Sequence, residues 1–240
     1  MELKLDLHVH SDHSPDGKMT LQEIKEACKA AGLNGCAICD HDRVFTDSVE
    51  DDSGFLVIPG VEISTEFGHL LGLFVHTPID TRKFHEAVRC IHEQGGLAVL
   101  AHPFEHRSDP AQIEPLVPFL DGVEVWNSRA DRKNKQANIM AKQFADVHHL
   151  CCFAGSDAHV PKEIGNTILS VQVDAYTPDA IKSALKKNKA QITGKRSPAR
   201  YTAASQLTKR QKNGASPAAY IKWGLFTAKC LVQDLMNKGE

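Results

Sequence analysis

Two histidines, one residue apart, make the start of this chain a candidate metal-binding segment. His8 and His10 lie at the end of an alternating apolar run, residues 3–10 (LKLDLHVH), which predicts a β-strand. Side chains two residues apart on a strand point to the same face, so both imidazoles would face one centre. Such a pair can equally be two hydrogen-bonded core histidines. The metal interpretation therefore depends on the rest of the chain.

Further metal-ligand side chains come directly after other predicted strands. The apolar runs 35–39, 55–61, 97–101, 122–126 and 150–154 each end in His, Asp, Glu or Asn, and a polar turn, residues 11–17, follows the first strand. In a barrel of parallel strands the carboxyl ends of all strands meet at one rim, where the side chains that follow them gather. The candidate metal ligands are His8, His10, Asp16, His41, Glu62, His102, Asn127, Asp157 and His159.

The elements that would position these residues are short apolar strands alternating with amphipathic helices. Helices are predicted over 20–31, where Thr20 and Glu23 form a capping box, from Thr81, over 132–147 and over 178–184. Additional strands are predicted at 69–75, 168–173 and 191–193. This alternation indicates an α/β protein with a parallel, fully covered sheet, and the polar strand ends favour a barrel. A doubly wound open sheet is the alternative, but the chain has no glycine-rich phosphate loop to support it.

Length and composition set bounds on the organisation. The 240 residues suit one large domain, or one domain with an appendage, and the net charge of -2 gives no global argument for nucleic acid or a membrane surface. The charged first residues do not resemble a signal peptide and no apolar stretch reaches the ~20 residues of a membrane span, so a cytoplasmic protein is expected. Cys36 and Cys39 are interpreted as buried structural thiols in a strand, since no second cysteine pair follows at zinc-ribbon spacing.

The composition changes near residue 195. We expect a barrel over residues 1–195 and a C-terminal helical appendage over 196–240, which contains an amphipathic segment from 218 to 236. The short basic run 209–212 (KRQK) could contact a polyanion, although such runs are more often solvated helix faces.

The order of these motifs resembles the polymerase and histidinol phosphatase (PHP) family over residues 1–195. The motifs are His-x-His on the first strand, Asp-His after the second, Glu after the third, His-Pro after a middle strand and Gly-Ser-Asp-Ala-His near the end. The resemblance implies a distorted (β/α)7 TIM-like barrel that binds two or three divalent metal ions and hydrolyses phosphate esters.

Carried over by position, the resemblance also implies roles for single residues. His8, His10, Glu62 and Asp157 would hold a first metal, Glu62 and His102 a second, and Asp16, His41 and His159 a third, with Glu62 bridging the first two. Asn127 stands where several relatives carry a histidine on the second metal, and Asp16 where some carry a histidine. His69 is similar to a family histidine that would protonate the leaving oxygen or hold the phosphate, so the implied catalytic residues are Glu62, His69 and Asp157. Mixed imidazole and carboxylate ligands suit Zn, Mn or Fe.

Arginines that leave the same rim are candidate phosphate ligands. Arg43, Arg129 and Arg132 follow the ligand-bearing strand ends, and Arg107 follows His102 at a greater distance. For each one, a solvated surface arginine is the competing interpretation.

These observations predict a metal-dependent phosphoric ester hydrolase that acts on a small phosphorylated substrate, a nucleotide or similar phosphomonoester, through a metal-activated hydroxide in a di- or trinuclear site. An exonuclease that shortens oligonucleotides is the alternative, motivated by the basic C-terminal region. A metal-dependent amidohydrolase would share His-x-His and a strand-terminal Asp but not the third centre. A non-enzymatic module with a vestigial site is favoured only by Asn127. The sequence predicts no oligomeric state.

Overall fold

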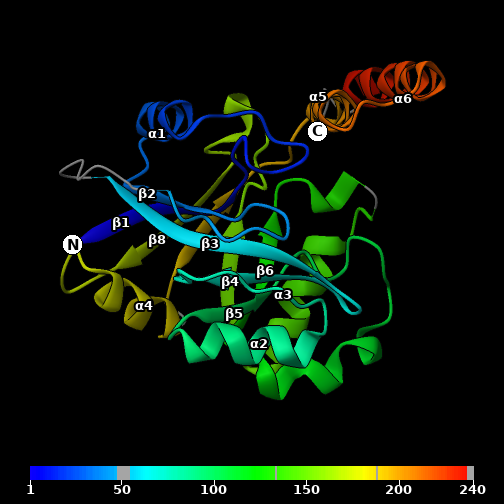
Figure 1. The fold of residues 1–240 in the computed structure, drawn as a ribbon. Helices are drawn as coiled ribbons and strands as arrows, with labels where there is room; N and C mark the ends of the chain where they lie inside the picture. Colours follow the sequence, from blue (N-terminus) through cyan, green and yellow to red (C-terminus); the bar gives the residue numbers. More distant parts are fainter. Residues whose placement is uncertain (48–54, 133, 188, 237–240) are drawn as a thin grey trace.

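A single nine-stranded sheet forms the centre of the molecule (Figure 1), seen in a computed structural model that describes residues 1–47, 55–132, 134–187 and 189–236. The strand order is β7-β6-β5-β4-β3-β2-β1-β8-β9. The strands are β1 Glu2–Val9, β2 Gly35–Ile38, β3 Leu56–Thr65, β4 Gly68–Leu73, β5 Leu97–Leu100, β6 Gly122–Asn127, β7 Cys151–Gly155, β8 Thr167–Gln172 and β9 Gln191–Gly194. The α-helices are α1 Leu21–Ala30, α2 Phe84–Glu93, α3 Ala137–His148, α4 Pro178–Lys186, α5 Ala199–Lys212 and α6 Pro217–Met236.

The sheet curls into a nearly closed barrel, because the end of β7 returns to β1. The backbone N–H of Asp157 donates to the carbonyl of His8 at 2.8 Å, and that of His10 donates to Ala158 at 2.9 Å. Val9 and Ala158 form an isolated parallel bridge at the same point. This closure brings the first and the last ligand-bearing strand ends together at one rim. The predicted α/β, TIM-like barrel is thereby confirmed.

The sheet is mixed, which differs from the all-parallel sheet that the sequence pattern suggests. Strand β4 runs antiparallel to both β3 and β5, and β8 runs antiparallel to both β1 and β9. A tight turn between Thr65 and Gly68 folds β4 back on β3, so no helix separates them. The remaining neighbours are parallel, as in a β/α barrel.

Two helices begin later than predicted because local hydrogen bonds compete with the first turn. The helix predicted from Thr81 begins at Phe84, since the Thr81 hydroxyl donates to Glu86 from outside the helix. The helix predicted from Arg132 begins at Ala137, after a 3-10 turn, Ala130–Arg132. The predicted capping box of α1 is present, with reciprocal bonds between Thr20 and Glu23.

Helices α5 and α6 form a hairpin beside the barrel (Figure 1). Trp223 of α6 donates its indole N–H to the carbonyl of Ala203 in α5, and Cys230 packs with Ala203 in a small core of their own. Lys212, near the end of α5, donates to the backbone carbonyls of Asp12 at 2.5 Å and Ser14 at 2.7 Å, which fastens the hairpin to the loop after β1. None of the helices in the described part of the chain is long and apolar enough to cross a membrane.

Cys36 and Cys39 are fully buried free thiols. Each packs in an apolar cluster, and burial raises the pKa of the Cys39 thiol far above its usual range. These are properties of structural cysteines, as the sequence indicates.

Candidate metal centre

The pair of histidines at the end of β1 faces one point inside the barrel rim. His8 and His10 are both fully buried, and their Nε2 atoms lie 3.2 Å apart. Two imidazoles on one tetrahedral zinc-type ion, with bonds of about 2.0–2.1 Å, would have their nitrogens about 3.3 Å apart. The spacing of this pair therefore matches that of two ligands on one cation.

Glu62 lies at the centre of the cluster, with its oxygens divided between two groups of histidines. Its Oε2 lies 3.5 Å from His8 Nε2, 3.4 Å from His10 Nε2 and 2.9 Å from His41 Nδ1, and its Oε1 lies 2.7 Å from His69 Nδ1 and 3.0 Å from His102 Nε2. The Glu62 side chain is only 1% exposed. A carboxylate with a separate set of ligands at each oxygen is suited to bridge two cations.

A further group lies on the side of His10 away from His102. Asp16 Oδ1 lies 3.2 Å from His159 Nε2 and 3.6 Å from His41 Nε2. Asp157 Oδ1 lies 3.3 Å from His10 Nε2. Three trios each offer ligand atoms within 4.8 Å of one another: His10, His41 and His159; His8, His10 and Glu62; and His41, Glu62 and His69.

The donors fit metal ions better than they fit hydrogen bonds with one another. Asp16 Oδ1, His69 Nδ1 and His159 Nε2 are buried and have no aligned hydrogen-bond partner among the residues that the structure describes, although each lies close to another ligand-type atom. Buried polar atoms without partners are rare and need an explanation. Lone pairs that converge on a shared point, rather than along donor–acceptor lines, are the arrangement that a cation requires.

Buried neighbours hold the ligands in place, and Glu124 is the most connected of them. Its Oε1 lies 3.0 Å from His8 Nδ1, and its Oε2 accepts from the backbone N–H of His102 at 2.8 Å and from Asn127 Nδ2 at 3.0 Å. A carboxylate on the outer ring nitrogen fixes the orientation of a ligating histidine and raises its basicity. On the other histidine of the pair, Ser14 Oγ lies 3.0 Å from His10 Nδ1.

Two ligand candidates adopt backbone conformations that non-glycine residues seldom take. The φ angles are 25° at His102 and 56° at Asp157, each of which is the second residue after the end of a β-strand. Such conformations persist where the surrounding structure over-determines them, and they cluster at functional sites. Here the hydrogen bonds from His102 N–H to Glu124 and from Asp157 N–H to the His8 carbonyl hold the two residues.

The ionisable groups of the cluster shift one another's pKa values. Burial opposes ionisation of Glu62, but the surrounding His69, His41 and His8 outweigh it and hold the pKa of this carboxyl well below its usual range. Burial and the neighbouring His159 lower the pKa of His10 to about 3, so this imidazole is neutral at pH 7 with its lone pair available. For His102, burial is outweighed by Glu62 and Glu105, which raise its pKa to about 9.

Asn127 presents the wrong atom to the cluster for a metal ligand. Its amide oxygen accepts from the backbone N–H groups of Arg129 at 2.8 Å and Ala130 at 3.1 Å, while its amide nitrogen donates to Glu124 and lies 3.4 Å from Asp157 Oδ2. The oxygen that would coordinate a cation is therefore engaged in the turn after β6. In this structure Asn127 orients carboxylates.

The predicted phosphate-binding arginines lie in three different environments. Arg129 is buried and lines the hollow at the metal centre, where its guanidinium pairs with Glu163, with Nε–Oε1 2.8 Å and Nη2–Oε2 2.5 Å. A phosphate contact by Arg129 stays a prediction. Arg43 is exposed and does not line the hollow at the metal centre. Arg132 lines that hollow, whereas Arg107 Nη2 donates to the carbonyl of Phe67 at 2.6 Å.

The ligand cluster opens into a hollow of about 400 Å³. One wall comes from α5, through Thr202, Ser205, Gln206 and Lys209, and another comes from Glu105 and His106. Sequence reasoning did not place these residues at the site, and it also missed Glu124. For Glu124 there was a signal, namely a carboxylate within the apolar strand GVEVW. For the α5 residues there was none beyond the basic run 209–212, because only the packed tertiary structure brings this helix over the rim.

Comparisons with known proteins agree with this fold. A family model described as PHP-associated matches residues 135–190. An uncharacterized protein of Methanocaldococcus jannaschii is 31% identical over 186 residues, which are 74% of this chain and 74% of that protein. A 5'-3' exoribonuclease of Haemophilus influenzae is 40% identical over 81 residues, 30% of this chain and 29% of that enzyme.

A solved structure shares the architecture. It is a two-domain protein from Bacteroides vulgatus that contains a predicted PHP-like metal-dependent phosphoesterase, with a TM-score of 0.63 and 21% sequence identity. The alignment covers 81% of this chain and 65% of that one. At this identity the similarity shows a shared fold.

Proposed function

The chain belongs to the PHP family, and on that premise we propose that it is a metal-dependent phosphoesterase that hydrolyses a small phosphorylated substrate, a nucleotide or similar phosphomonoester. The observation that carries the proposal is the division of the Glu62 oxygens, Oε2 toward His8, His10 and His41 and Oε1 toward His69 and His102. A buried carboxylate surrounded by imidazoles offers the mixed oxygen and nitrogen ligands of a metal site.

The contacts support an assignment of the residues that would hold divalent ions, for which we propose Zn, Mn or Fe. We assign His8, His10, Glu62 and Asp157 to one ion, Glu62 and His102 to a second, and Asp16, His41 and His159 to a third. When bound, such ions would neutralise charge on the phosphate and lower the pKa of water to about 7. His69 joins Glu62 and His41 in one of the ligand trios, so it either completes the second ion's shell or serves the substrate.

The side chains that line the hollow supply the remaining chemistry. A phosphomonoester dianion repels an incoming nucleophile, and cationic groups at the rim offset that repulsion. Arg132 and Lys209 line the hollow and can contact the phosphate. His69, with a side chain 36% exposed, is placed to hold a proton for the leaving oxygen.

The size of the hollow supports a small substrate. Pockets of about 300–1,000 Å³ accommodate small molecules, and this one, at about 400 Å³, lies at the lower end. The covering helix α5 reaches the metal rim through Ser205 and Lys209, which limits the approach of a bulky polymer.

Phosphate release tests the proposal. The purified protein, loaded with Mn or Zn, is incubated with a panel of phosphomonoesters beside His8→Ala and the matched control His76→Ala, which changes an exposed histidine outside the cluster. We expect release by the wild type and by His76→Ala, and none above background by His8→Ala. Equal rates for all three proteins, or no release by metal-loaded wild type, would refute the assignment.

An exonuclease acting on short oligonucleotides is the second candidate function. Lys209, from the basic run of α5, lines the hollow, and one relative of this chain is a 5'-3' exoribonuclease. This function predicts shortening of end-labelled oligonucleotides, with binding that weakens steeply as salt rises. Oligonucleotides that remain intact while phosphomonoesters are hydrolysed would exclude it.

A further inference from the structure

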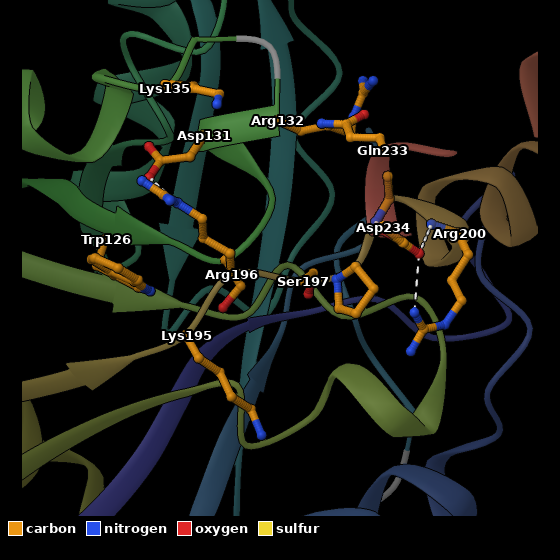
Figure 2. Close-up of a pocket in the computed structure, with 13 residues that line it drawn as sticks. Trp126, Asp131, Arg132, Lys135, Lys195, Arg196, Ser197, Arg200, Gln233 and Asp234 are labelled. Carbon is orange, nitrogen blue, oxygen red and sulfur yellow. Dashed lines mark hydrogen bonds and ion pairs between the residues drawn. The ribbon is translucent and has the colours of Figure 1, made fainter. Parts of the chain in front are cut away.

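A second hollow, larger than the one at the metals, lies between the barrel and the C-terminal helices. Its volume is about 560 Å³, and its walls come from β6, the turn after β6, the link from β9 to α5, and the end of α6 (Figure 2). Arg132 lines both hollows, so they adjoin at this side chain. The family model that matches residues 135–190 does not include the segment that forms most of this hollow.

The charge balance of the walls is positive. Five basic residues line the hollow, Arg132, Lys135, Lys195, Arg196 and Arg200, against two acidic ones, Asp131 and Asp234. Both acidic groups are already paired: Arg196 Nε lies 2.9 Å from Asp131 Oδ2, and Arg200 Nη1 lies 3.0 Å from Asp234 Oδ2, as the dashed lines in Figure 2 show. Asp234 also caps the start of α5 by accepting from Ala199 N at 2.6 Å.

Three cations are left without a carboxylate. Within residues 1–47, 55–132, 134–187 and 189–236, no ion pair joins Arg132, Lys135 or Lys195 to an acidic side chain. Lys135 and Lys195 are exposed, and in Figure 2 Lys195 extends away from the Arg196–Asp131 pair. The hollow thus concentrates positive charge that nothing in the described chain neutralises.

The indole of Trp126 forms part of the same wall and makes the hollow open to a spectroscopic test. The indole packs against Gly194, where an added Cβ would lie 2.0 Å from Nε1, so the neighbouring residue must be glycine for the ring to fit. Because Nε1 is buried in this contact, a ligand in the hollow would meet the ring and not the N–H itself. In Figure 2 the nitrogen lies on the side of the ring nearer Arg196.

From these observations we propose that this basic hollow binds a phosphate group, with Lys135, Lys195 and Arg132 supplying the positive charge. Phosphate oxygens accept charge-assisted bonds from ammonium and guanidinium donors, which matches this set of donors. The phosphate has two possible sources: a second phosphate on a substrate whose reacting end is at the metals, or a separate phosphate ligand. Binding of phosphate in this hollow requires no catalytic turnover, so it does not depend on the proposed function.

Trp126 provides a site-specific test because the chain has only two tryptophans. In a Trp223→Phe background the emission reports Trp126 alone, and titration with inorganic phosphate should give a saturable change. The double variant Lys135→Ala/Lys195→Ala should raise the Kd about tenfold or more. Lys222→Ala, an exposed lysine of α6 outside both hollows, is the matched control and should bind as the parent does.

The metal centre could also bind phosphate, so a His8→Ala background separates the two sites. The proposal requires that the Trp126 response persists in His8→Ala and is weakened by the lysine double variant. A response that disappears with His8→Ala, or that the lysine double variant leaves unchanged, overturns it. If Trp223→Phe disturbs the helix hairpin, calorimetric titration of phosphate into protein with both tryptophans makes the same comparison.

A kinetic comparison identifies the source of the phosphate. If the lysine double variant raises KM for a nucleoside carrying two phosphates but not for the same nucleoside carrying one, the ligand is part of the substrate. If KM is unchanged for both while phosphate binding is weakened, the ligand is separate. Both results support the site. This kinetic arm depends on the proposed activity, whereas the fluorescence arm does not, so failure of one is distinguishable from failure of the other.

Discussion

The two hollows that meet at Arg132 are built on opposite principles. At the metal centre, the ligands stand at the ends of barrel strands, are nearly all buried, and face groups of opposite charge, as Glu62 does with its histidines. In the second hollow, exposed lysines project from the turn before α3 and from the link between β9 and α5, and no carboxylate of the described residues pairs with them. The first arrangement fixes geometry, as cation coordination and catalysis require. The second supplies charge without fixed geometry, which suits the binding of a phosphate.

Arg129, which lines the metal hollow but not the second one, gives the largest expected effect on stability. Replacing Arg129 by Ala leaves Glu163 buried without its partner, which should lower the free energy of unfolding by about 3–5 kcal/mol. Urea unfolding measures the change. Arg43→Ala, an exposed arginine, is the control and should change stability by less than about 0.5 kcal/mol. A stable Arg129→Ala protein with a raised KM would instead support Arg129 as a phosphate ligand.

Glu124 tests whether the metal side depends on buried orienting groups. Glu124→Gln keeps the volume but removes the charge that faces His8 Nδ1, and loss of such a partner costs about 10–100-fold in metal affinity or activity. Metal titration monitored by calorimetry is the measurement. Glu114→Gln, on an exposed turn, should bind metal as the wild type does. Unchanged affinity in Glu124→Gln would mean that the backbone alone positions His8.

Lys209 sharpens the comparison from the substrate side, because it lines only the metal hollow. Loss of one charge-assisted contact in Lys209→Ala should raise KM for a phosphomonoester about tenfold and leave the metal content unchanged. Lys195→Ala should not change KM for a substrate that carries one phosphate. Steady-state kinetics measures KM for each variant. Equal effects of the two variants on KM would show that the hollows act as a single site.

Asp121 lies at the end of β6 away from the metal centre, and its ion pairs with His92 and Lys186 contribute to stability alone. Burial opposes its ionisation, but the Ala98 N–H, Lys186 and His92 outweigh burial and lower the pKa of this carboxyl. A lowered folded-state pKa contributes stability above the ordinary value near 3.8, and this contribution is lost as pH falls through the folded pKa.

Asp121→Asn should therefore cost about 1 kcal/mol near pH 7, with the difference shrinking as the pH falls below about 4. Chemical unfolding at several pH values measures it, with the exposed Asp174→Asn as control. A deficit that is constant over the whole pH range would refute the electrostatic explanation.

The sequence predicts the metal side far better than the second hollow, for a physical reason. Ligands such as His8 and Glu62 follow directly from strand periodicity, because a strand end and a polar residue are adjacent in the chain. The barrel itself was predictable from the same pattern, but the antiparallel β4 was not, since a short apolar run does not specify its direction.

Pairings between distant segments escape such reasoning. Glu163 lies 34 residues from Arg129, and local sequence gives no sign that the two meet. The same holds for Gly194 and Trp126, whose indole packs against this glycine and lines the second hollow. Asn127 was placed correctly at the rim, yet only the packed turn after β6 shows that its amide oxygen faces two backbone N–H groups.

The central claim is that Glu62 joins neighbouring cations at the barrel rim, and metal content measures this most directly. Elemental analysis by mass spectrometry, on protein loaded with Mn or Zn and then dialysed, should find at least two ions per wild-type chain. The account predicts that Glu62→Gln retains the fold and loses at least one of these ions, while Glu93→Gln, an exposed residue of α2, loses none. Wild-type protein without bound metal, or a Glu62→Gln variant with the full complement, would contradict it.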